Sequence, residues 1–316
     1  MSDYLKAICK LHNSIQLQDF LPSSDKKIYH YTSPAGFQGI ITNSTLRFTD
    51  RFFLNDYTEG VYVLDLCIEN LDSLVPNDRN FREELSRVFK EQKEKMNETY
   101  IYVYQCSFSL DNDNLSLWNY YTKGDSIQGY NLCFEADQIQ KKLHLKQKNN
   151  EKLSPLYGVV VYEKQEQLNI IRRIIEKFQR SNQVYPENYQ FTIRLLVQKL
   201  LVIGTFFKMP CFEIEHEFRL VFDLNSDTLK YRQKGTDKPI PLKEILSNQK
   251  YFEKGGILIP CIDVEFESDA LKGIGISPTL DFETTKSSIY RATEINFPQI
   301  KENKDSVYPS KIPVRY

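Results

Sequence analysis

The segment 99–109, TYIYVYQCSFS, constrains the fold most, because most of its residues are aromatic or β-branched. Such a run fits the pleated surface of a β-strand, and the turn-forming sequence DNDN soon after it ends the element. The whole chain is 13% aromatic, with 20 Tyr and 20 Phe against a single Trp. This composition favours strands and stacking surfaces over a helical bundle rich in Leu and Ala.

Further strand patterns lie on both sides of this segment, and helical patterns lie between them. We expect strands at 26–32, 45–49, 129–135, 156–162, 212–222, 255–260, 263–266, 273–276 and 307–314. Apolar residues at helical spacing predict helices within 34–41, 62–95, 115–121, 163–207 and 283–291, with breaks near Pro76 and Pro186. Strand runs with helices inserted between them are typical of the α+β class. We therefore expect one elaborated α+β domain over 1–316, with helical insertions at about 60–97 and 163–207.

Charge and cysteine usage exclude several functional classes. The 316 residues carry 41 Lys and Arg against 42 Asp and Glu, which argues against a protein that works mainly by neutralising nucleic-acid phosphates. The six cysteines form no CxxC pair, and the chain shows no signal-peptide pattern, Gly-rich phosphate loop, HExxH or GxSxG motif. We expect buried, reduced thiols, a cytoplasmic location, no resident metal and no membrane association.

The expected strand 212–222 carries the most informative polar pattern. Its alternate positions hold three carboxylates and one arginine, which a period of two would place on one face: Glu213, Glu215, Glu217 and Arg219. His216 would then lie on the apolar face as a structural residue. A carboxylate pair in a covered sheet can stabilise a cationic transition state or accept a proton. The alternative is a solvated face of an edge strand, but the apolar run at 220–222 favours a strand covered on both faces.

Two polar clusters follow early strands. His30, Tyr31 and Thr32 stand where a strand gives way to a helix, a place where free backbone N–H groups can contact a ligand. Ser33 before Pro34 also reads as a helix cap, and both interpretations can hold together. Asn55 and Asp56 follow an apolar stretch and, on spacing alone, indicate a helix cap with an acidic first turn.

A third cluster follows the strand 99–109. Ser107 belongs to that strand, and Trp118 and Tyr121 lie three residues apart on the helix expected next. At this spacing the two rings share a helix face. They form either one wall of a pocket for a planar ring or a stripe of the core.

These blocks, in this order, resemble the bacterial family catalogued as domain of unknown function 2971. The resemblance spans nearly the whole chain and rests on the following blocks: YHYTS with GII, LND with Glu59, CSFS, LS-x-W with NYY, GY before Phe134, Lys208 before E-x-E-F-R, and a terminal SKIPVR. Tyr57 stands where the family usually has proline, and Ser277 where it usually has glycine.

A more distant resemblance, to the ADP-ribosyltransferases, implies a function. In that superfamily a histidine, a tyrosine and a glutamate follow in this order, and the resemblance implies a split β-sheet core with NAD as the substrate. Carried over, it assigns His30 and Thr32 to the adenosine or nicotinamide-ribose side of NAD. It assigns Tyr121 or Trp118 to stacking on nicotinamide, and Glu217, with Glu215 second, to catalysis. The implied cofactor-binding set also includes Tyr31, Asn55, Asp56, Ser107 and Arg219.

Three hypotheses follow. The first is an NAD-consuming ADP-ribosyltransferase or NAD glycohydrolase, acting as a bacterial toxin or antiphage effector on a protein or nucleic-acid target, with an antitoxin or defence-system partner. The second is a non-catalytic sensor that keeps the cleft for a nucleotide or a protein. The third is a magnesium-dependent nuclease that uses Asp56, Glu59 and the pair Glu215 and Glu217 as oxygen ligands.

Overall fold

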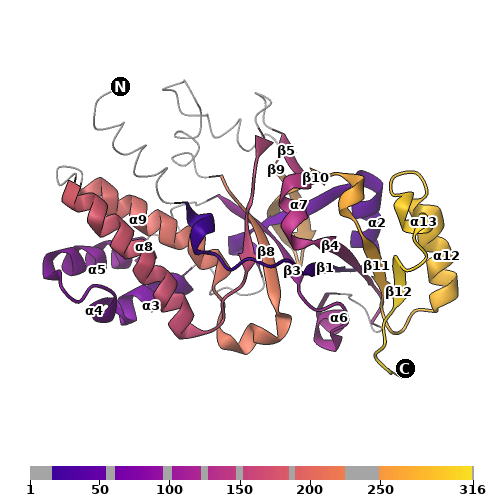
Figure 1. The fold of residues 1–316 in the computed structure, drawn as a ribbon, viewed down its shortest axis with the longest axis horizontal. Helices are drawn as coiled ribbons and strands as arrows, with labels where there is room; N and C mark the ends of the chain where they lie inside the picture. Colours follow the sequence, from indigo (N-terminus) through magenta and orange to yellow (C-terminus); the bar gives the residue numbers. More distant parts are fainter. Residues whose placement is uncertain are drawn as a thin grey trace.

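The protein is described here by a computed structural model that covers residues 16–54, 61–94, 102–121, 127–146, 152–184, 189–224 and 249–314. Within these residues one mixed, twelve-stranded sheet runs in the order β12-β11-β4-β1-β3-β2-β10-β5-β6, with β7 on β8, β8 on β3 and β9 on β10 (Figure 1). The only parallel pair among the described strands is β11 with β12. The expected α+β class is confirmed.

The strands are β1 (Lys27–Thr32), β2 (Thr45–Asp50), β3 (Val103–Ser109), β4 (Tyr130–Glu135), β5 (Leu143–Lys146), β6 (Lys152–Leu153), β7 (Leu156–Val159), β8 (Glu217–Asp223), β9 (Gln249–Lys254), β10 (Ile257–Phe266), β11 (Gly273–Ile276) and β12 (Val307–Pro309). The α-helices are α2 (Pro34–Asn43), α3 (Tyr62–Glu69), α4 (Leu71–Leu74), α5 (Arg79–Glu94), α6 (Leu115–Tyr121), α7 (Ala136–Lys142), α8 (Lys164–Val184), α9 (Tyr189–Ile203), α12 (Phe282–Thr293) and α13 (Gln299–Glu302).

Local sequence explains where several helices begin. The hydroxyl of Ser33 accepts a hydrogen bond from the amide of Gly36, and Pro34 takes the first position of α2, where its missing N–H costs nothing. Asp281 caps α12 in the same way through the amide of Thr284. The capping role expected for Ser33 is confirmed.

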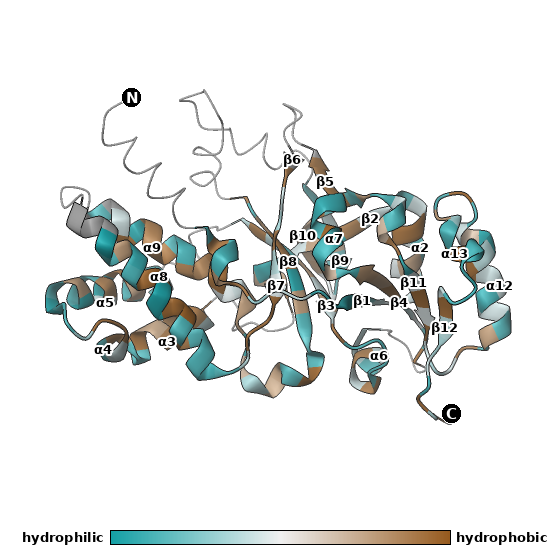
Figure 2. Ribbon diagram, in the orientation of Figure 1, coloured by the Kyte–Doolittle hydropathy of each residue, from teal (hydrophilic) through white to brown (hydrophobic). Residues whose placement is uncertain are grey.

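The two helical insertions pack together into one body, the helical layer, which comprises α3, α4, α5, α8 and α9 (Figure 1). Figure 2 shows hydrophobic and hydrophilic residues mixed along these helices, as expected for helices that each bury one face. The buried faces form a core that also takes in Val103 of β3 and Val221 of β8. The helical layer therefore covers one face of the sheet around these two strands.

A second core covers the other face of the same strands. Phe108 of β3 and Leu220 of β8 contribute to it, and residues of α2, α7, α12 and α13 close it. Every residue of β8 is buried as a result. The expectation that this strand is covered on both faces is confirmed.

The prediction of a strand at 212–222 is wrong for the first half of that segment. Residues Pro210–Glu215 form the 3-10 helix η5, and His216 turns the chain with a positive φ of 40° before β8 begins at Glu217. The alternation therefore does not apply to Glu213, which is exposed, or to His216, which is half exposed and bonds Asp111 instead of lying on an apolar face. Pro210 favours the start of a helical turn, and this local preference overrides the strand-like pattern.

Other differences are smaller. The structure adds β5, β6 and β9 to the expected strands, and it joins the segments expected at 255–260 and 263–266 into one strand, β10. The break expected near Pro76 is confirmed, since it lies between α4 and α5, but the first of the two helices expected over 62–95 is divided into α3 and α4. Cys67, Cys106, Cys133 and Cys261 are buried as expected, but Cys211 is exposed because η5 lies at the surface.

The sheet opens along one side of β3. On its other side β3 pairs with β8 from Val103 to Ser109 without interruption. On the open side Ser109 pairs with Tyr29 of β1, whereas Tyr104 and Gln105 pair with β2. Between these contacts β1 and β2 diverge. We call this opening the split.

Candidate functional site

A cavity of about 220 Å³ lies at the split. All five residues of β3 from 105 to 109 line it, although successive side chains of a strand point to opposite faces of the sheet. A cavity on one face would meet mainly alternate side chains, so this one lies at the edge of β3. The remaining lining residues are Tyr29, His30, Tyr31, Arg47, Thr49, Phe53, Leu54, Leu117, Tyr120, Tyr121, Lys208, Phe212, Glu215, Glu217, Arg219, Phe252, Lys254 and Ile259.

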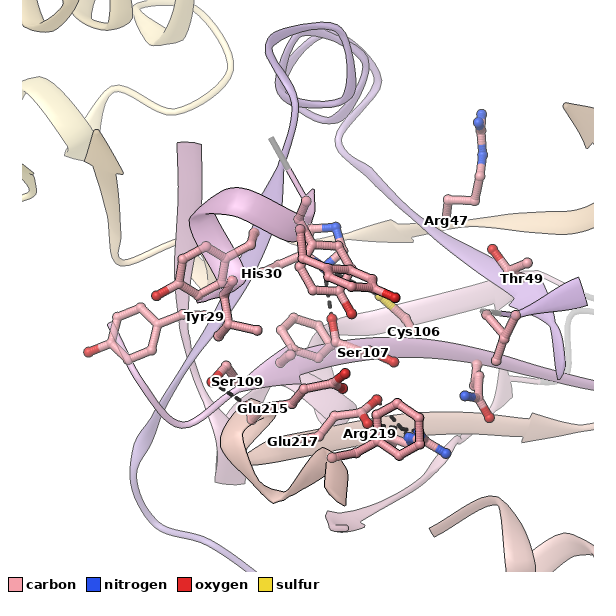
Figure 3. A pocket seen from close by; sticks show the side chains of 18 of the residues that line it. Tyr29, His30, Arg47, Thr49, Cys106, Ser107, Ser109, Glu215, Glu217 and Arg219 are labelled. Atoms are coloured by element: carbon pink, nitrogen blue, oxygen red, sulfur yellow. Dashed lines mark hydrogen bonds and ion pairs between the residues drawn. The ribbon is translucent and has the colours of Figure 1, made fainter. Parts of the chain in front are cut away.

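A largely buried cluster of two carboxylates and two cations forms the floor of this cavity. Figure 3 labels Glu215, Glu217 and Arg219, and the fourth member is Lys208. Arg219 donates two hydrogen bonds to Glu217, from Nε to Oε1 and from Nη2 to Oε2, both 2.7 Å long. Lys208 Nζ lies 2.7 Å from Glu215 Oε2 and 3.3 Å from Glu217 Oε2. A bidentate arginine fixes the plane of a carboxylate as well as its charge, so Glu217 has one defined orientation.

The helical layer contributes to this cluster. Arg219 also donates from Nη1 to the carbonyl oxygen of Thr205, which lies in the short 3-10 helix η4 (Gly204–Phe206) after α9. Gln167 of α8 donates to the carbonyl oxygen of Lys208 at 2.9 Å, and Tyr62 of α3 donates to Gln167 at 3.0 Å. One helix from each insertion therefore takes part in holding the segment that carries Lys208.

The two carboxylates have opposite pKa shifts. Burial by itself raises the pKa of Glu217, but the charges of Arg219 and Lys208 outweigh it, with further hydrogen bonds from Arg219 and Ser107, and lower the pKa to about 2. Burial and the neighbouring charge of Glu217 raise the pKa of Glu215, against the opposing charge of Lys208. Glu217 is therefore a fixed anion at neutral pH, and Glu215 is the better proton acceptor of the two.

His30 closes the opposite side of the split. Its Nδ1 lies 2.9 Å from the carbonyl oxygen of Ser107, and burial lowers the pKa of the imidazole below its usual value. A neutral ring facing a carbonyl must carry its proton on Nδ1, so Nε2 is left as an acceptor. In an antiparallel pair, successive residues direct their main-chain N–H and C=O groups alternately toward and away from the partner strand. The carbonyl of Ser107 points away from β8 and toward the split, so it has no partner in β8 and accepts a hydrogen bond from His30 instead.

Aromatic side chains form one wall of the cavity. Tyr120 and Tyr121 of α6 line it with ring centroids 5.6 Å apart, and Tyr29 and Tyr31 of β1 line it as well. Trp118 does not line this cavity. It is 1% exposed and packs edge-on against Tyr31 with centroids 4.7 Å apart. Of the two readings of the pair on α6, Tyr121 fits the pocket wall and Trp118 fits the core.

The structure brings most of the expected site residues together. Seven of them line the one cavity: His30, Tyr31, Ser107, Tyr121, Glu215, Glu217 and Arg219. Thr32 and Trp118 do not line it, and Asn55 and Asp56 lie outside the described residues. Lys208 was the main omission from the expected set. Its only signal in the sequence is its place before the E-x-E-F-R block.

Within the described ranges no three His, Cys, Asp or Glu side chains are grouped so that they could hold a metal ion. The loop carboxylates proposed as magnesium ligands, Asp56 and Glu59, fall outside those ranges. None of the helices in the described part of the chain is both long and apolar enough to span a membrane.

A comparison with family models gives one match. The model described as "Protein of unknown function (DUF2971)" matches residues 117–220. This match supports the resemblance to the DUF2971 family that the sequence blocks indicated. It covers about a third of the chain, and that third includes most of α6, from Leu117 onward, and the complete carboxylate and cation cluster. No curated protein and no solved structure matches the chain.

Proposed function

We propose that the chain is an ADP-ribosyltransferase-like, NAD-consuming enzyme whose reaction takes place in the cavity at the split. One observation carries this proposal. His30, Tyr121 and the pair Glu215 and Glu217 are far apart in the sequence, yet they line one cavity at the edge of β3. They supply a neutral hydrogen-bonding imidazole, a ring that can stack and a fixed anion, the groups that the ADP-ribosyltransferase resemblance assigns to binding and cleaving NAD.

The chemistry assigns a separate role to each carboxylate. Breaking the C–N glycosidic bond builds positive charge on the ribose, and a preorganised anion in a site shielded from water stabilises that charge. Glu217 has this property because it is buried and stays ionised. Glu215, with its raised pKa, is suited to take the proton of the attacking acceptor, which is water in glycohydrolysis and a target side chain or base in transfer.

The size of the cavity fits the reacting part of the substrate. At about 220 Å³ it is smaller than the roughly 300–1,000 Å³ of a typical small-molecule site. It therefore matches a nicotinamide ring and its ribose better than a complete dinucleotide. Arg47 and Lys254, which also line it, would accompany the phosphates.

The test is release of nicotinamide from NAD by the purified chain, measured by chromatography. We expect Glu217→Gln to abolish release, because the amide keeps the shape but loses the charge, with a loss of at least about a hundredfold in kcat. Glu213→Gln is the matched control, since Glu213 lies on the adjacent turn and is exposed. Equal activity of the two variants would refute the assignment of Glu217.

A non-catalytic sensor is the second candidate, and one observation favours it. Both oxygens of Glu217 are already bonded to Arg219, an arrangement that also serves purely to hold a fold together. A sensor predicts NAD binding in titration calorimetry without nicotinamide release.

A toxin or antiphage role is part of the leading proposal. It predicts that expression of the wild-type chain, but not of Glu217→Gln, arrests bacterial growth, and that a partner protein from the same source relieves the arrest. Growth arrest by both forms would separate toxicity from the proposed chemistry.

A further inference from the structure

One block of the sequence on which the family resemblance rests, the terminal SKIPVR, has no part in the proposed reaction. Residues 310–314, which we call the strap, follow the edge strand β12 and pass over the loop that precedes α6. The amide of Ser310 still bonds the carbonyl oxygen of Ile276, so the strap starts from the sheet. Ile312 then packs against the small core of Leu117, Trp118 and Tyr31.

Asp113 joins the strap to α6. Its Oδ1 accepts hydrogen bonds from the indole Nε1 of Trp118 at 2.8 Å and from the hydroxyl of Ser310 at 2.6 Å. Its Oδ2 accepts from the main-chain amide of Lys311 at 2.7 Å. Three donors on one carboxylate form a charge-assisted junction that is stronger than neutral hydrogen bonds.

The same loop reaches the cavity through Tyr31. The hydroxyl of Tyr31 donates to the carbonyl oxygen of Asp111 at 2.9 Å and accepts from the amide of Asn114 at 3.1 Å. Its ring packs edge-on against Trp118 and lines the cavity. Displacement of Asp113 would therefore change the position of a cavity wall.

The loop also holds the turn that carries Glu215. Asn114 donates from Nδ2 to the carbonyl oxygen of Ile214 at 3.1 Å, and Asp111 Oδ2 lies 2.9 Å from His216 Nδ1. The hydroxyl of Ser109 donates to the carbonyl oxygen of Glu215 at 2.8 Å. The loop thus bonds both α6 and the end of η5, which flank the cavity.

We propose that the strap positions α6 and the turn at 214–216, and that Asp113, which the strap bonds, is the positioning residue. By fixing the loop 110–114, Asp113 fixes the position of α6 relative to the turn at 214–216, so that Tyr121 and Glu215 line one cavity. Asp113 itself does not line that cavity. The kinetic consequence rests on the proposed NAD reaction, whereas the positioning of α6 does not.

The structural arm of the test uses the chain's single tryptophan, Trp118, whose emission reports on this junction directly. In the full chain we compare Asp113→Asn and Ser310→Ala with Lys311→Ala, a control because only the main-chain amide of Lys311 bonds Asp113. The first two variants should shift the emission to longer wavelength and increase quenching by acrylamide, and amide exchange should rise in 115–121 and 214–216. The control should match the wild type. Unchanged quenching and exchange in Asp113→Asn and Ser310→Ala would overturn the proposal.

The kinetic arm separates positioning from general destabilisation. We expect Asp113→Asn to raise the KM for NAD about tenfold, because Tyr121 loses its position in the cavity wall. It should lower kcat by less than Glu217→Gln does, because Glu215 is displaced but still present. Loss of kcat at unchanged KM, or unchanged kinetics despite a loosened α6, would overturn the proposal. A wild-type chain that releases no nicotinamide refutes the proposed function instead, and the fluorescence and exchange results still decide whether the strap positions α6.

Discussion

The ion pair of Glu217 and Arg219 leads to the sharpest prediction. Arg219→Met removes the cation and leaves the carboxylate of Glu217 buried, with Lys208 at 3.3 Å as the cation left beside it. Breaking a buried pair by removing one partner costs about 3–5 kcal/mol of unfolding free energy, and the lost bond to Thr205 adds to this. The lowered pKa of Glu217 agrees in direction, because the charge of Arg219 is the largest of the influences that lower it.

The pH dependence gives the sign. In the wild type the pKa of Glu217 is lower in the folded state, so its stabilisation is complete above about pH 4.5 and is lost as the pH falls toward 2. The variant Arg219→Met removes the largest influence that lowers this pKa. Burial, which raises it, is then opposed mainly by Lys208, so the pKa of Glu217 in the folded state rises. The stability of the variant relative to wild type should therefore improve as the pH falls from about 7 to about 4.

Urea unfolding at several pH values measures both effects. Arg47→Met is the matched control, because Arg47 pairs with Asp263 at 3.1 Å but its side chain is 50% exposed, and such pairs contribute about 0–1 kcal/mol. A cost for Arg219→Met no larger than that of the control, or a difference from wild type that does not change with pH, would refute the reasoning.

Two further predictions concern packing and His30. Gly204→Ala would place a Cβ 2.6 Å from Val63 Cγ1, so it should lower the unfolding free energy measured in urea by about 1–3 kcal/mol. Adding Val63→Ala should relieve part of that cost, because it removes the clashing methyl group. Additive losses in the double variant would contradict direct packing of the two insertions. Because burial lowers the folded pKa of His30, the unfolded state binds a proton first as the pH falls, so the wild type should lose stability below about pH 6.5. His30→Gln should remove that part of the pH slope, and identical slopes would show that His30 does not titrate as described.

Much of the fold could be predicted because its signals are local. β3 follows from its aromatic and β-branched residues, and α2 follows from Ser33 and Pro34. The 3-10 helix Pro210–Glu215 was missed because a short turn and a strand can carry the same alternating pattern. Pro210 favours the turn, and contacts with the loop before α6 hold it in place. The site was predictable as a set of residue types, whereas Lys208 had no spacing that indicated its role.

The sequence by itself determined most of the strands and helices, that helices are inserted between the strands, and which polar residues are available for chemistry. These properties depend on the intrinsic preferences of neighbouring residues. Only the tertiary structure decided that the two insertions form one helical layer, that β1 and β2 diverge along β3, and that Tyr121 rather than Trp118 lines the cavity. It also decided that Glu215 and Glu217 acquire opposite pKa shifts, because burial and the positions of Lys208 and Arg219 depend on contacts between distant segments.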